Sequence, residues 1–531
     1  MEKLRIYAES LPLTFGSWII SFTGIAIIRT FFEQYPDFSK GRFVLIDLPT
    51  IVHYGVSYLA ISLGLMCILM FFGKIKIREA LAIGILGSSI ILLAPIIDLV
   101  AGGIGGYQIS YFFLPLKELF FSFLTFFGWH THSGITLGIQ IETILGIIFC
   151  YIYVHATTKN IYRAIGAAIA FYCLIFFIFS LPSFAVLFAI QQNTPINTIV
   201  QSAFSSHIIQ NNIHPAFTTD NLGLFDLAFN KIMIGLNTLV VMVATIFLFF
   251  LGTRKKLQVM IKNSRPERIF HFFLLFLFGS ALVHTTWFAN WVDVQVYILA
   301  FISFISAWMF CVCQNDIYDE EIDSISNKDR PFISKDLSKD DMEIASKIFL
   351  LFTFLTAYAA SHYMLFFVSL FLFVYYIYSN PPLRLKRFVI INSFLVSLAC
   401  LSVILAGFFL VNNDKSILAF PPALVLAIII FFTAVTNIRD IKDFEGDKAD
   451  NIKTLPVLLG LNKSKKLIAG IICFFFLLIP WYFNAPILFI PSIVAVIFSW
   501  YFITAKNYVE WKGFMVYMAY LVLIIGVFIF K

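Results

Sequence analysis

Apolar runs long enough to cross a bilayer recur along the whole chain, and they constrain its fold more than any other feature. A helix of roughly 20 apolar residues spans the hydrocarbon core of a membrane. Of the 531 residues, 60% are hydrophobic and 13% are charged, whereas soluble domains carry about 25% charged residues. The alternating segments of roughly 10 residues that build a transmembrane β-barrel do not occur in the sequence. The sequence therefore predicts an all-α polytopic membrane protein.

The apolar runs fall into two groups separated by the most basic segment of the chain, GTRKKLQVMIKNSRPER at 252–268. Six spans are predicted before it, at 12–32, 51–72, 79–101, 134–155, 162–190 and 231–252. Nine are predicted after it, at 269–289, 294–313, 344–361, 363–379, 388–410, 418–437, 466–482, 485–504 and 513–530. A further apolar stretch, 110–128, contains Pro115, Lys117 and Glu118, so we expect it to be re-entrant or interfacial. We predict two domains, an N-terminal region of six or seven spans at 1–252, without an assigned function, and a second domain at 253–531.

The charges of the loops orient these spans, because Lys and Arg collect on the cytoplasmic side of membrane proteins. The loops with Lys74, Arg78 and Arg163 and the segment 252–268 are basic, whereas the long loop 191–230 is nearly free of basic residues. Counting onward from these loops places 314–343, 380–387 and 438–465 in the cytoplasm. We therefore predict a multi-pass protein of the cell or inner membrane, surrounded by lipid. The net charge of +7 is the sum of such loop charges, and no nucleic-acid partner is expected.

Two acidic stretches follow apolar runs on this predicted cytoplasmic face. Asp316, Asp319 and Asp323 are spaced three and then four residues apart, and the same spacing returns 124 residues later in Asp440, Asp443 and Asp447. Residues three and four apart share one face of a helix. Three carboxylates on one face repel one another unless a cation lies between them, and Mg²⁺ prefers such oxygen ligands and often shares them with phosphates. The repeated spacing favours a cation site over an ordinary solvated acidic loop.

Neutral and basic residues accompany both acidic sets. Asn315 directly precedes the first set, Lys328 and Arg330 follow it, and Lys453 follows the second set. Arginine and lysine side chains are the usual partners of phosphate oxygens. Carboxylates that bind a metal, next to cations that bind phosphate, form an arrangement that stabilises a departing diphosphate.

The residues of these stretches resemble one family of membrane enzymes. NDIYDEEID at 315–323 matches the N-D-x-x-D-x-x-x-D motif of the UbiA superfamily of intramembrane prenyltransferases. NKDRP at 327–331, YSNPPLRLKR at 378–387 and DIKDFEGDKADNIKTLPVLLG at 440–460 are similar to the motifs that follow it in that family. The resemblance covers roughly residues 260–531 and does not extend to residues 1–250.

The resemblance implies a nine-helix bundle that transfers a prenyl group from a polyprenyl diphosphate to a lipid-accessible acceptor. It implies Mg²⁺ as the cofactor, held by the catalytic aspartates Asp316, Asp319, Asp323, Asp440, Asp443 and Asp447. The residues that it places at the diphosphate are Asn315, Lys328, Arg330, Lys386, Arg387 and Lys453. Three tyrosines are candidates for sheltering an allylic cation through their ring faces, Tyr318, Tyr376 and Tyr378. The family's acceptors include aromatic quinone precursors, glycerol-phosphate lipids and sugar phosphates.

Other functions compete with prenyl transfer. A cation-coupled transporter would also carry carboxylates, although transporter acids lie near the middle of the bilayer on broken helices. The N-terminal region has a separate hypothetical function, as a docking platform or a lipid-binding module.

Three ionisable residues stand in or near the predicted spans of the N-terminal region. We expect Arg29 and Asp98 to lie close enough to the interface for their side chains to reach water. Glu142 is deeper, and is either neutral and hydrogen-bonded or linked to a substrate.

Overall fold

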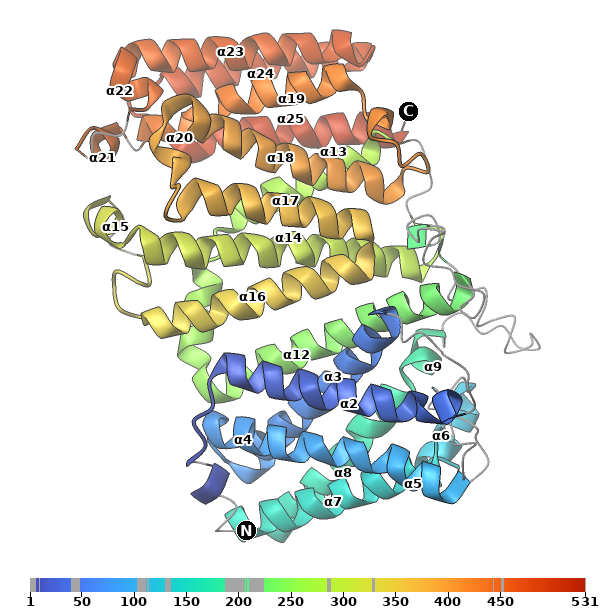
Figure 1. The fold of residues 1–531 in the computed structure, drawn as a ribbon. Coiled ribbons are helices and arrows are strands. Elements are labelled where there is room, and N and C mark those ends of the chain that lie inside the picture. The colour runs from blue at the N-terminus through green and yellow to red at the C-terminus, as the bar shows by residue number, and fades with distance from the viewer. Residues whose placement is uncertain are drawn as a thin grey trace. The chain divides into compact units, whose positions relative to one another are not determined.

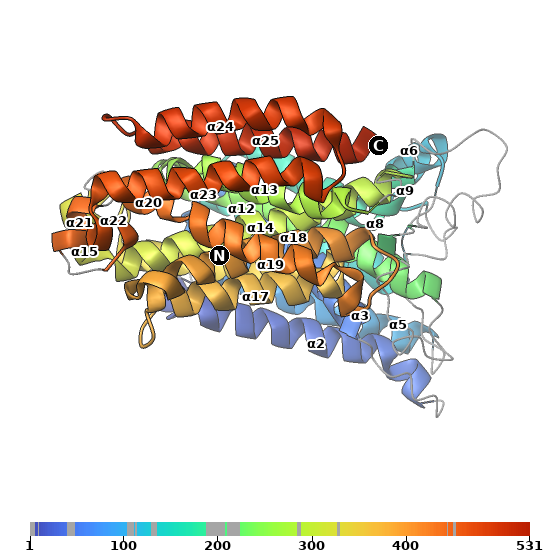
Figure 2. The same ribbon diagram turned by 90° about the horizontal axis from the view of Figure 1, so that it is seen from above.

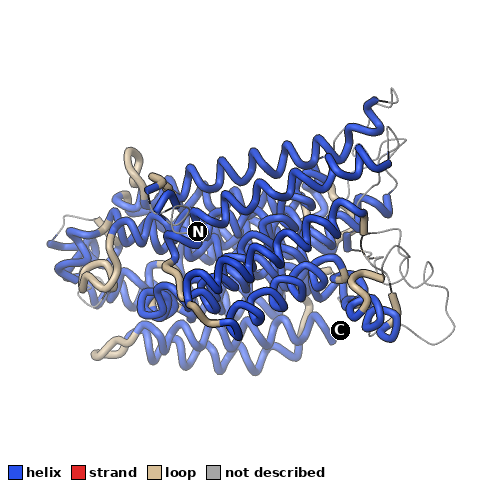
Figure 3. Tube along the Cα trace, turned by 90° about the horizontal axis from the view of Figure 1, so that it is seen from below, coloured by secondary structure: helices blue, strands red, loops and turns tan. Residues whose placement is uncertain are grey.

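The computed structural model describes residues 6–8, 10–39, 48–102, 111, 114–128, 135–186, 206, 208–209, 224–283, 288–326, 330–442, 444–449 and 453–530. Figure 3 shows that the described elements are helices joined by loops, without a strand. Among these residues, 14 helices are long and apolar enough to cross a membrane. The prediction of an all-α polytopic membrane protein is therefore confirmed.

Contacts between residues divide the chain into two compact units. Unit 1 comprises Met1–Leu257 together with Asn290–Gln295, and unit 2 comprises Gln258–Ala289 together with Val296–Lys531. The helix α12 (Leu224–Lys262) begins in unit 1 and ends in unit 2. Its backbone leaves the helical conformation at Thr253, with φ −145° and ψ 46°. The chain therefore passes from one unit to the next inside a kinked helix.

Unit 1 is built around α3 (Leu48–Gly73), an apolar helix with small residues on several faces. It contacts α2 (Phe15–Ser39), α4 (Ile77–Ser88), α7 (Leu137–Thr158) and α8 (Ile161–Phe179). The predicted span 79–101 is interrupted in the structure, because α4 passes into a 3₁₀ turn, η1 (Ser89–Leu92), and then into α5 (Leu93–Gly102). Two further short helices are α6 (Leu116–Leu124), inside the stretch predicted to be re-entrant or interfacial, and α9 (Leu181–Val186).

Unit 2 contains the helices that follow α12, except for the first residues of α14, which belong to unit 1. Those long enough to cross a membrane are α14 (Trp291–Tyr318), α16 (Lys339–Ala360), α17 (His362–Ser379), α18 (Val389–Val411), α19 (Pro422–Val435, which continues into α20), α23 (Leu461–Tyr482), α24 (Phe489–Thr504, preceded by the turn η6, Pro486–Leu488) and α25 (Glu510–Phe530). The predicted span at 269–289 corresponds to α13 (Pro266–Ala281), which has 16 residues. In this unit α13 packs on α18 and α25, α17 packs on α18, and α23 packs on α24.

The crossing of α13 and α18 depends on two glycines. A Cβ atom added to Gly279 would lie 1.9 Å from the carbonyl oxygen of Ile404, and one added to Gly407 would lie 2.0 Å from that of Phe276. Ser280 also donates a hydrogen bond of 3.1 Å to the carbonyl oxygen of Gly407. Small residues allow helix backbones to approach this closely inside membranes. The two helices are therefore fixed against each other at one crossing point.

Both acidic stretches continue the helices that precede them. The first lies at the end of α14 and in α15 (Glu320–Ser326), and the second lies in α20 (Asn437–Lys442) and α21 (Phe444–Ala449). Figures 1 and 2 show α15, α20, α21 and α22 (Leu455–Leu459) at one end of unit 2, where α15 contacts α21. The fold thus brings together two segments that are more than a hundred residues apart in the sequence.

Candidate functional site

Asp316 lies in the last turn of α14 and is 1% exposed. Asn263 donates a hydrogen bond of 2.8 Å to its Oδ2 atom, and the guanidinium groups of Arg265 and Arg330 lie 2.8 Å and 3.2 Å from its Oδ1 atom. A buried carboxylate is stable only when cations or hydrogen-bond donors compensate its charge. Asp316 therefore has three such partners from two loops.

Asp319 and Asp323 continue the same face of the chain. The amide of Asp319 donates to the carbonyl of Asn315 at 2.9 Å, and that of Asp323 donates to the carbonyl of Asp319 at 2.8 Å. The helical hydrogen-bond pattern thus persists between α14 and α15. Arg330 forms an ion pair with Asp323 as well as with Asp316, so that one guanidinium bridges two of the three carboxylates.

Asp319 is bound by the loop that follows α17. Arg384 lies 2.6 Å from its Oδ1 atom, and Lys386 forms an ion pair with its Oδ2 atom. Burial lowers the pKa of the Lys386 ammonium, and the negative charge of Asp319 opposes this shift. The Nε atom of Arg384 is buried and has no hydrogen-bond acceptor among the described residues. A buried donor without a partner costs free energy, so an anionic oxygen placed beside it would be stabilised.

Arg265 reaches Asp316 from a strained backbone position. It precedes α13 with φ 53° and ψ 66°, in the left-handed region that few residues other than glycine adopt. Pro266, the first residue of α13, suits the start of a helix because its missing N–H has no partner there. Burial lowers the pKa of the Arg265 guanidinium, while Asp316 opposes this shift. The strained turn therefore serves to direct a cation at the first aspartate.

Asn315 has a different partner from the aspartates. Its side-chain oxygen accepts a hydrogen bond of 2.7 Å from Ser379, the last residue of α17. The neighbouring Gln314 donates a hydrogen bond of 3.1 Å to Ser346 of α16. These contacts tie the end of α14 to two adjacent helices and so fix the orientation of the first acidic set.

The structure describes the second acidic set only in part. Asp440 is 5% exposed, and its Oδ1 atom lies 3.8 Å from Nε of Arg439. Arg439 also donates to the hydroxyl of Tyr378 at 3.0 Å. Asp443 and the side chain of Asp447 lie outside the described residues.

The predicted basic residues have different outcomes. Arg330 and Lys386 pair with the first acidic set, whereas Lys328 lies outside the described residues. Arg387 and Lys453 are exposed, and neither side chain forms a hydrogen bond or ion pair with another described residue. The structure therefore does not bring these two side chains to the described carboxylates.

A cavity of about 320 Å³ lies beside the first acidic set. Its lining includes five cationic side chains and two carboxylates, Arg265, Arg268, Arg330, Arg439, Lys442, Glu267 and Glu510. Arg268 lies 2.6 Å from Glu510. The remaining lining includes aromatic rings such as Tyr375 and Trp308. This polar cavity suits an anionic molecule with an apolar part.

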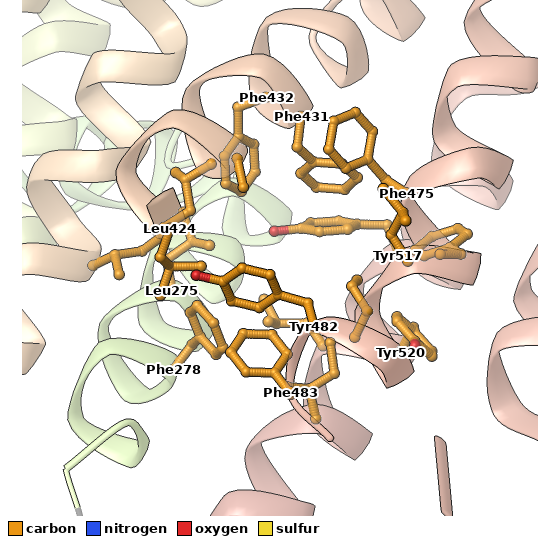
Figure 4. Close-up of a pocket in the computed structure, with 18 residues that line it drawn as sticks. Leu275, Phe278, Leu424, Phe431, Phe432, Phe475, Tyr482, Phe483, Tyr517 and Tyr520 are labelled. Carbon is orange, nitrogen blue, oxygen red and sulfur yellow. The ribbon is translucent and has the colours of Figure 1, made fainter. Parts of the chain in front are cut away.

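A second cavity, of about 140 Å³, adjoins the polar cavity, because Phe432 and Tyr517 line both. Figure 4 shows aromatic rings around it, including those of Phe431, Phe475 and Tyr482. Its lining is almost entirely apolar side chains. At the boundary, His271 lies 3.2 Å from the hydroxyl of Tyr517. A polar chamber therefore continues into an apolar one.

Of the three tyrosines considered as shelters for a cation, Tyr318 and Tyr376 are more than 40% exposed, and Tyr378 is buried against Arg439. The tyrosine ring that lines the polar cavity from α17 belongs to Tyr375. Tyr376 and Tyr378 are neighbours of Tyr375 on α17, and 3.6-residue periodicity does not by itself identify the cavity side of a helix that is apolar all around.

Sequence reasoning missed four residues that bind the acidic residues or line the polar cavity, Asn263, Arg265, Arg384 and Arg268. Asn263, Arg265 and Arg268 stand in the segment 252–268, which the sequence analysis interprets only as a signal of membrane orientation and as a domain boundary. Arg384 stands two residues before Lys386, so the alternation in LRLKR was an available signal for a pair of cations on one side of the loop. Among the described residues no three His, Cys, Asp or Glu side chains form a metal site.

Residues 272–524 match the model of the UbiA prenyltransferase family. A homogentisate phytyltransferase from Synechocystis sp. is 27% identical over 168 residues, which cover 29% of this chain and 54% of the relative. A probable homogentisate phytyltransferase 2 from Oryza sativa subsp. japonica, a chloroplastic protein, is 26% identical over 204 residues, 37% of this chain and 53% of the relative. The chain thus spans about half the length of the curated relatives that it matches.

Solved structures of similar proteins cover about half of the chain. A UbiA homolog from Archaeoglobus fulgidus bound to GPP and Mg²⁺ has 19% sequence identity and a TM-score of 0.41, over 51% of this chain and 100% of that one. An apo UbiA homolog from Aeropyrum pernix K1 has 19% identity and a TM-score of 0.39, over 50% of this chain and 98% of that one.

Proposed function

We propose, from the premise that residues 272–524 form a domain of the UbiA prenyltransferase family, that this protein transfers a prenyl group from a polyprenyl diphosphate to an acceptor with the help of Mg²⁺. The observation that supports the proposal is that the carboxylates of the first acidic set are paired with cationic side chains. These pairs can be exchanged for contacts with a metal and a diphosphate. Asp316, Asp319 and Asp323 lie within ion-pair distance of four cationic side chains.

Those ion pairs join carboxylates to cationic side chains. A bound metal and diphosphate would separate the two kinds of group. We propose that the aspartates bind Mg²⁺ together with Asp440, Asp443 and Asp447, and that Arg265, Arg330, Arg384 and Lys386 turn to the phosphate oxygens. Carboxylate oxygens are the ligands that Mg²⁺ prefers, and guanidinium groups bind phosphate through paired N–H donors. The partnerless Nε atom of Arg384 supports this fit, because a phosphate oxygen would satisfy it.

The chemistry at this site is the departure of the diphosphate. When bound, Mg²⁺ supplies positive charge that polarises the phosphoryl oxygens. The cationic side chains stabilise the negative charge that grows on the leaving diphosphate, and such preorganised stabilisation is usually the largest contribution to catalysis. Their partly buried positions strengthen the effect, because charges interact more strongly away from water.

The two adjoining cavities suit the two substrates. We propose that the apolar cavity at Phe431 and Tyr482 holds part of the prenyl chain, and that the acceptor enters the polar cavity. Arg268, Arg439 and Lys442 line that cavity away from the ion pairs of Asp319, which favours an acceptor with a carboxylate or phosphate group. The curated relatives are named for phytyl transfer to homogentisate, and an aromatic acid is the acceptor class that we propose first.

The location of the site at one end of unit 2 agrees with the predicted topology. Arg384, Lys386 and Arg387 stand in one loop at this end, next to α15. Basic loops collect in the cytoplasm. We therefore propose that prenyl transfer takes place at the cytoplasmic face of the membrane.

The test is product analysis with the purified full-length protein. The protein is incubated with prenyl diphosphates of several lengths and a panel of aromatic acids, glycerol phosphates and sugar phosphates, with Mg²⁺ or with EDTA, and products are identified by mass spectrometry. We expect a prenylated acceptor only in the presence of Mg²⁺, and its loss in Asp316→Asn. Glu343→Gln is the matched control, because the Glu343 side chain is 44% exposed and its ion-pair partner is Lys347 at 4.0 Å.

The same assay separates transfer from cation transport. A transporter would consume no prenyl diphosphate under any of these conditions. Turnover of the diphosphate that persists unchanged in EDTA would contradict the metal assignment, and product formed equally well by Asp316→Asn would contradict the role of the first acidic set.

A further inference from the structure

Unit 1 contains a small cavity of about 60 Å³ enclosed by α2, α3, α4, η1, α7 and α8. Two charged residue types line it, Arg29 and Glu142, together with the hydroxyl groups of Tyr58, Ser62, Ser88 and Thr143. Drug-sized ligands need pockets of about 300 Å³ or more, whereas one water needs roughly 10–15 Å³. The size of the cavity therefore excludes a prenyl chain or an aromatic acceptor and suits a small ion or a few waters.

Arg29 is 1% exposed and already has fixed partners. Its Nη2 atom lies 2.6 Å from Glu33, its Nε donates to the hydroxyl of Tyr58 at 3.1 Å, and its Nη1 donates to the carbonyl of Ile91 at 2.7 Å. The expectation that this side chain reaches water at the membrane interface is wrong, because these three contacts hold it inside the unit. Arg29 and Glu33 compensate each other's charge.

Asp98 of α5 is also buried, at 3% exposure, so the same expectation is wrong for it. Its carboxylate accepts a hydrogen bond of 2.7 Å from the backbone N–H of Gly138, at the start of α7. The first N–H groups of a helix lack partners within the helix and carry partial positive charge. Asp98 is therefore compensated by the beginning of α7.

Glu142 remains without a compensating partner. It stands in the second turn of α7 and lines the cavity. It forms no hydrogen bond and no ion pair with any other described residue. Arg29, Glu33 and Asp98 are the charged groups near it, α3 contributes Tyr58, and the lining residues of α4 and α8 include no titratable side chain. A carboxylate in apolar surroundings is costly unless a proton or a cation neutralises it.

The hydroxyl groups of the lining offer oxygen atoms to such a cation. Ser88 donates its proton to the carbonyl of Gly84 at 2.6 Å, Thr143 donates to that of Ile139 at 2.7 Å, and Ser62 lies 3.0 Å from Ser88. Because the Ser88 and Thr143 protons are used elsewhere, the lone pairs of these oxygens remain available. Hard cations take oxygen ligands of this kind.

We propose that this cavity binds a small monovalent cation, either a hydrated proton or an alkali-metal ion, and that Glu142 supplies the compensating negative charge. A single uncompensated carboxylate selects a single positive charge. The site belongs to unit 1, so the proposal does not depend on prenyl transfer by unit 2.

Carbodiimide labelling tests the proposal on the full-length protein in lipid nanodiscs. Dicyclohexylcarbodiimide reacts with protonated carboxyl groups in apolar surroundings, and peptide mass spectrometry measures the modified fraction of Glu142. In a buffer of choline chloride, we expect Glu142 to react faster than the exposed Glu343 and to react more slowly as the pH rises. If an alkali ion is the occupant, NaCl or KCl at constant pH and ionic strength slows the reaction further; if the proton is the occupant, these salts have no effect.

Two variants of α3 provide a matched comparison. Ser62 lines the cavity, whereas Ser57 donates to the carbonyl of His53 at 2.9 Å and is not part of the lining. We expect Ser62→Ala to shift the pH or salt dependence of labelling and Ser57→Ala to leave it unchanged. Equal shifts in both variants, or labelling of Glu142 that is absent or independent of pH and salts, would overturn the proposal.

A stability measurement covers the case in which labelling is blocked by limited access of the reagent. The amide of Glu142→Gln is neutral without a cation, so the melting temperature of this variant should lose the dependence on pH or alkali salt that the wild-type protein shows. An identical dependence in both proteins would overturn the proposal.

Discussion

Each aspartate of the first acidic set is within ion-pair distance of at least one cationic side chain, and Arg330 serves two of them. Every carboxylate of the first acidic set therefore has a partner before any substrate binds, and these contacts must be exchanged during binding. Such pairs stabilise the ligand-free fold, since three buried carboxylates without cations would repel one another. In the proposed mechanism the same side chains are preorganised for a metal and a diphosphate.

Replacement of Arg330 tests this exchange. Arg330→Ala leaves Asp316 and Asp323 with fewer compensating charges, and we expect the free energy of unfolding to fall by about 1–3 kcal/mol. Because Mg²⁺ takes over part of the compensation, MgCl₂ should raise the melting temperature of Arg330→Ala more than that of the wild-type protein. Differential scanning fluorimetry measures both shifts, with Lys347→Ala as the exposed control. Equal Mg²⁺ shifts in all three proteins would argue against metal binding at these carboxylates.

The lowered pKa of Lys386 predicts that activity falls at alkaline pH. Burial lowers the pKa of its ammonium group in the folded protein, so the neutral form appears at lower pH than for an exposed lysine. A neutral Lys386 no longer stabilises a diphosphate, and kcat/KM should fall as the pH rises through this lowered pKa. Lys386→Arg keeps its charge at these pH values and should move the fall to higher pH. The pH profile of kcat/KM is the measurement, and a profile unchanged by Lys386→Arg would contradict the role given to this lysine.

The lowered pKa of Lys386 also determines how the stability of the fold changes with pH. Above the folded-state pKa the unfolded chain binds more protons than the folded one, so stability gains from this group as the pH rises toward the unfolded-state pKa of lysine. Loss of activity and gain of stability therefore have opposite signs in this alkaline range. A pH titration of the melting temperature, compared between the wild-type protein and Lys386→Arg, separates the two effects.

At the scale of elements, the positions of the helices determine where the acidic sets meet. α13 crosses α18 through Gly279 and Gly407, where an added Cβ atom would overlap a backbone carbonyl. Backbone atoms cannot move aside as flexible side chains can. This crossing fixes α13, which carries Arg268 and His271, beside the polar cavity.

Substitution of Gly407 tests the crossing. Gly407→Ala places a methyl group 2.0 Å from the carbonyl oxygen of Phe276, and we expect a loss of about 1–3 kcal/mol, as for other overpacked interiors. Gly470→Ala in α23 is the control, because no atom lies within 4 Å of its added Cβ. Thermal unfolding in detergent measures both. A melting temperature of Gly407→Ala equal to that of Gly470→Ala would show that the two helices are not held at this point.

The sequence predicted most of the elements because membrane spans have a strong signal in apolar length. It also singled out the first acidic set and Arg330, which stand close together in the chain; it assigned Arg330 to the diphosphate, and the structure pairs it with Asp316 and Asp323. It could not predict Arg265 or Arg384 as partners of the aspartates, since those contacts depend on how loops after α12 and α17 fold back over α14. It also assigned Arg387 and Lys453 to the diphosphate, whereas both side chains are exposed in the structure. A basic residue near a motif carries no information about the direction of its side chain.

At the scale of the whole molecule, the last turn of α12 belongs to the unit that contains the proposed active site. Val259 and Met260 pack against Cys313, Leu337 and Met342 of unit 2. Asn263 and Arg265 follow directly and bind Asp316. The boundary between the two proposed domains therefore lies before these residues, and the connection between them is also a support of the first acidic set.

Truncation tests this boundary. We expect a chain that begins at residue 253 to retain prenyl transfer, because it keeps the end of α12 together with Asn263 and Arg265. A chain that begins at residue 266 lacks Asn263 and Arg265, two of the three partners of Asp316, and should lose at least about 100-fold in kcat/KM, the loss typical of removing a preorganised electrostatic contact. Activity is measured after both proteins are shown to be monodisperse and helical. Equal activity in the two chains would place the boundary elsewhere.

The most direct test of the central claim is the release of inorganic diphosphate by the full-length protein from a prenyl diphosphate and an aromatic acid. The account predicts release that requires Mg²⁺ and the acceptor, that falls at least about 100-fold in Asp319→Asn, and that is unchanged in Glu343→Gln. Release that continues in EDTA, or that is equal in Asp319→Asn and the wild-type protein, would contradict it.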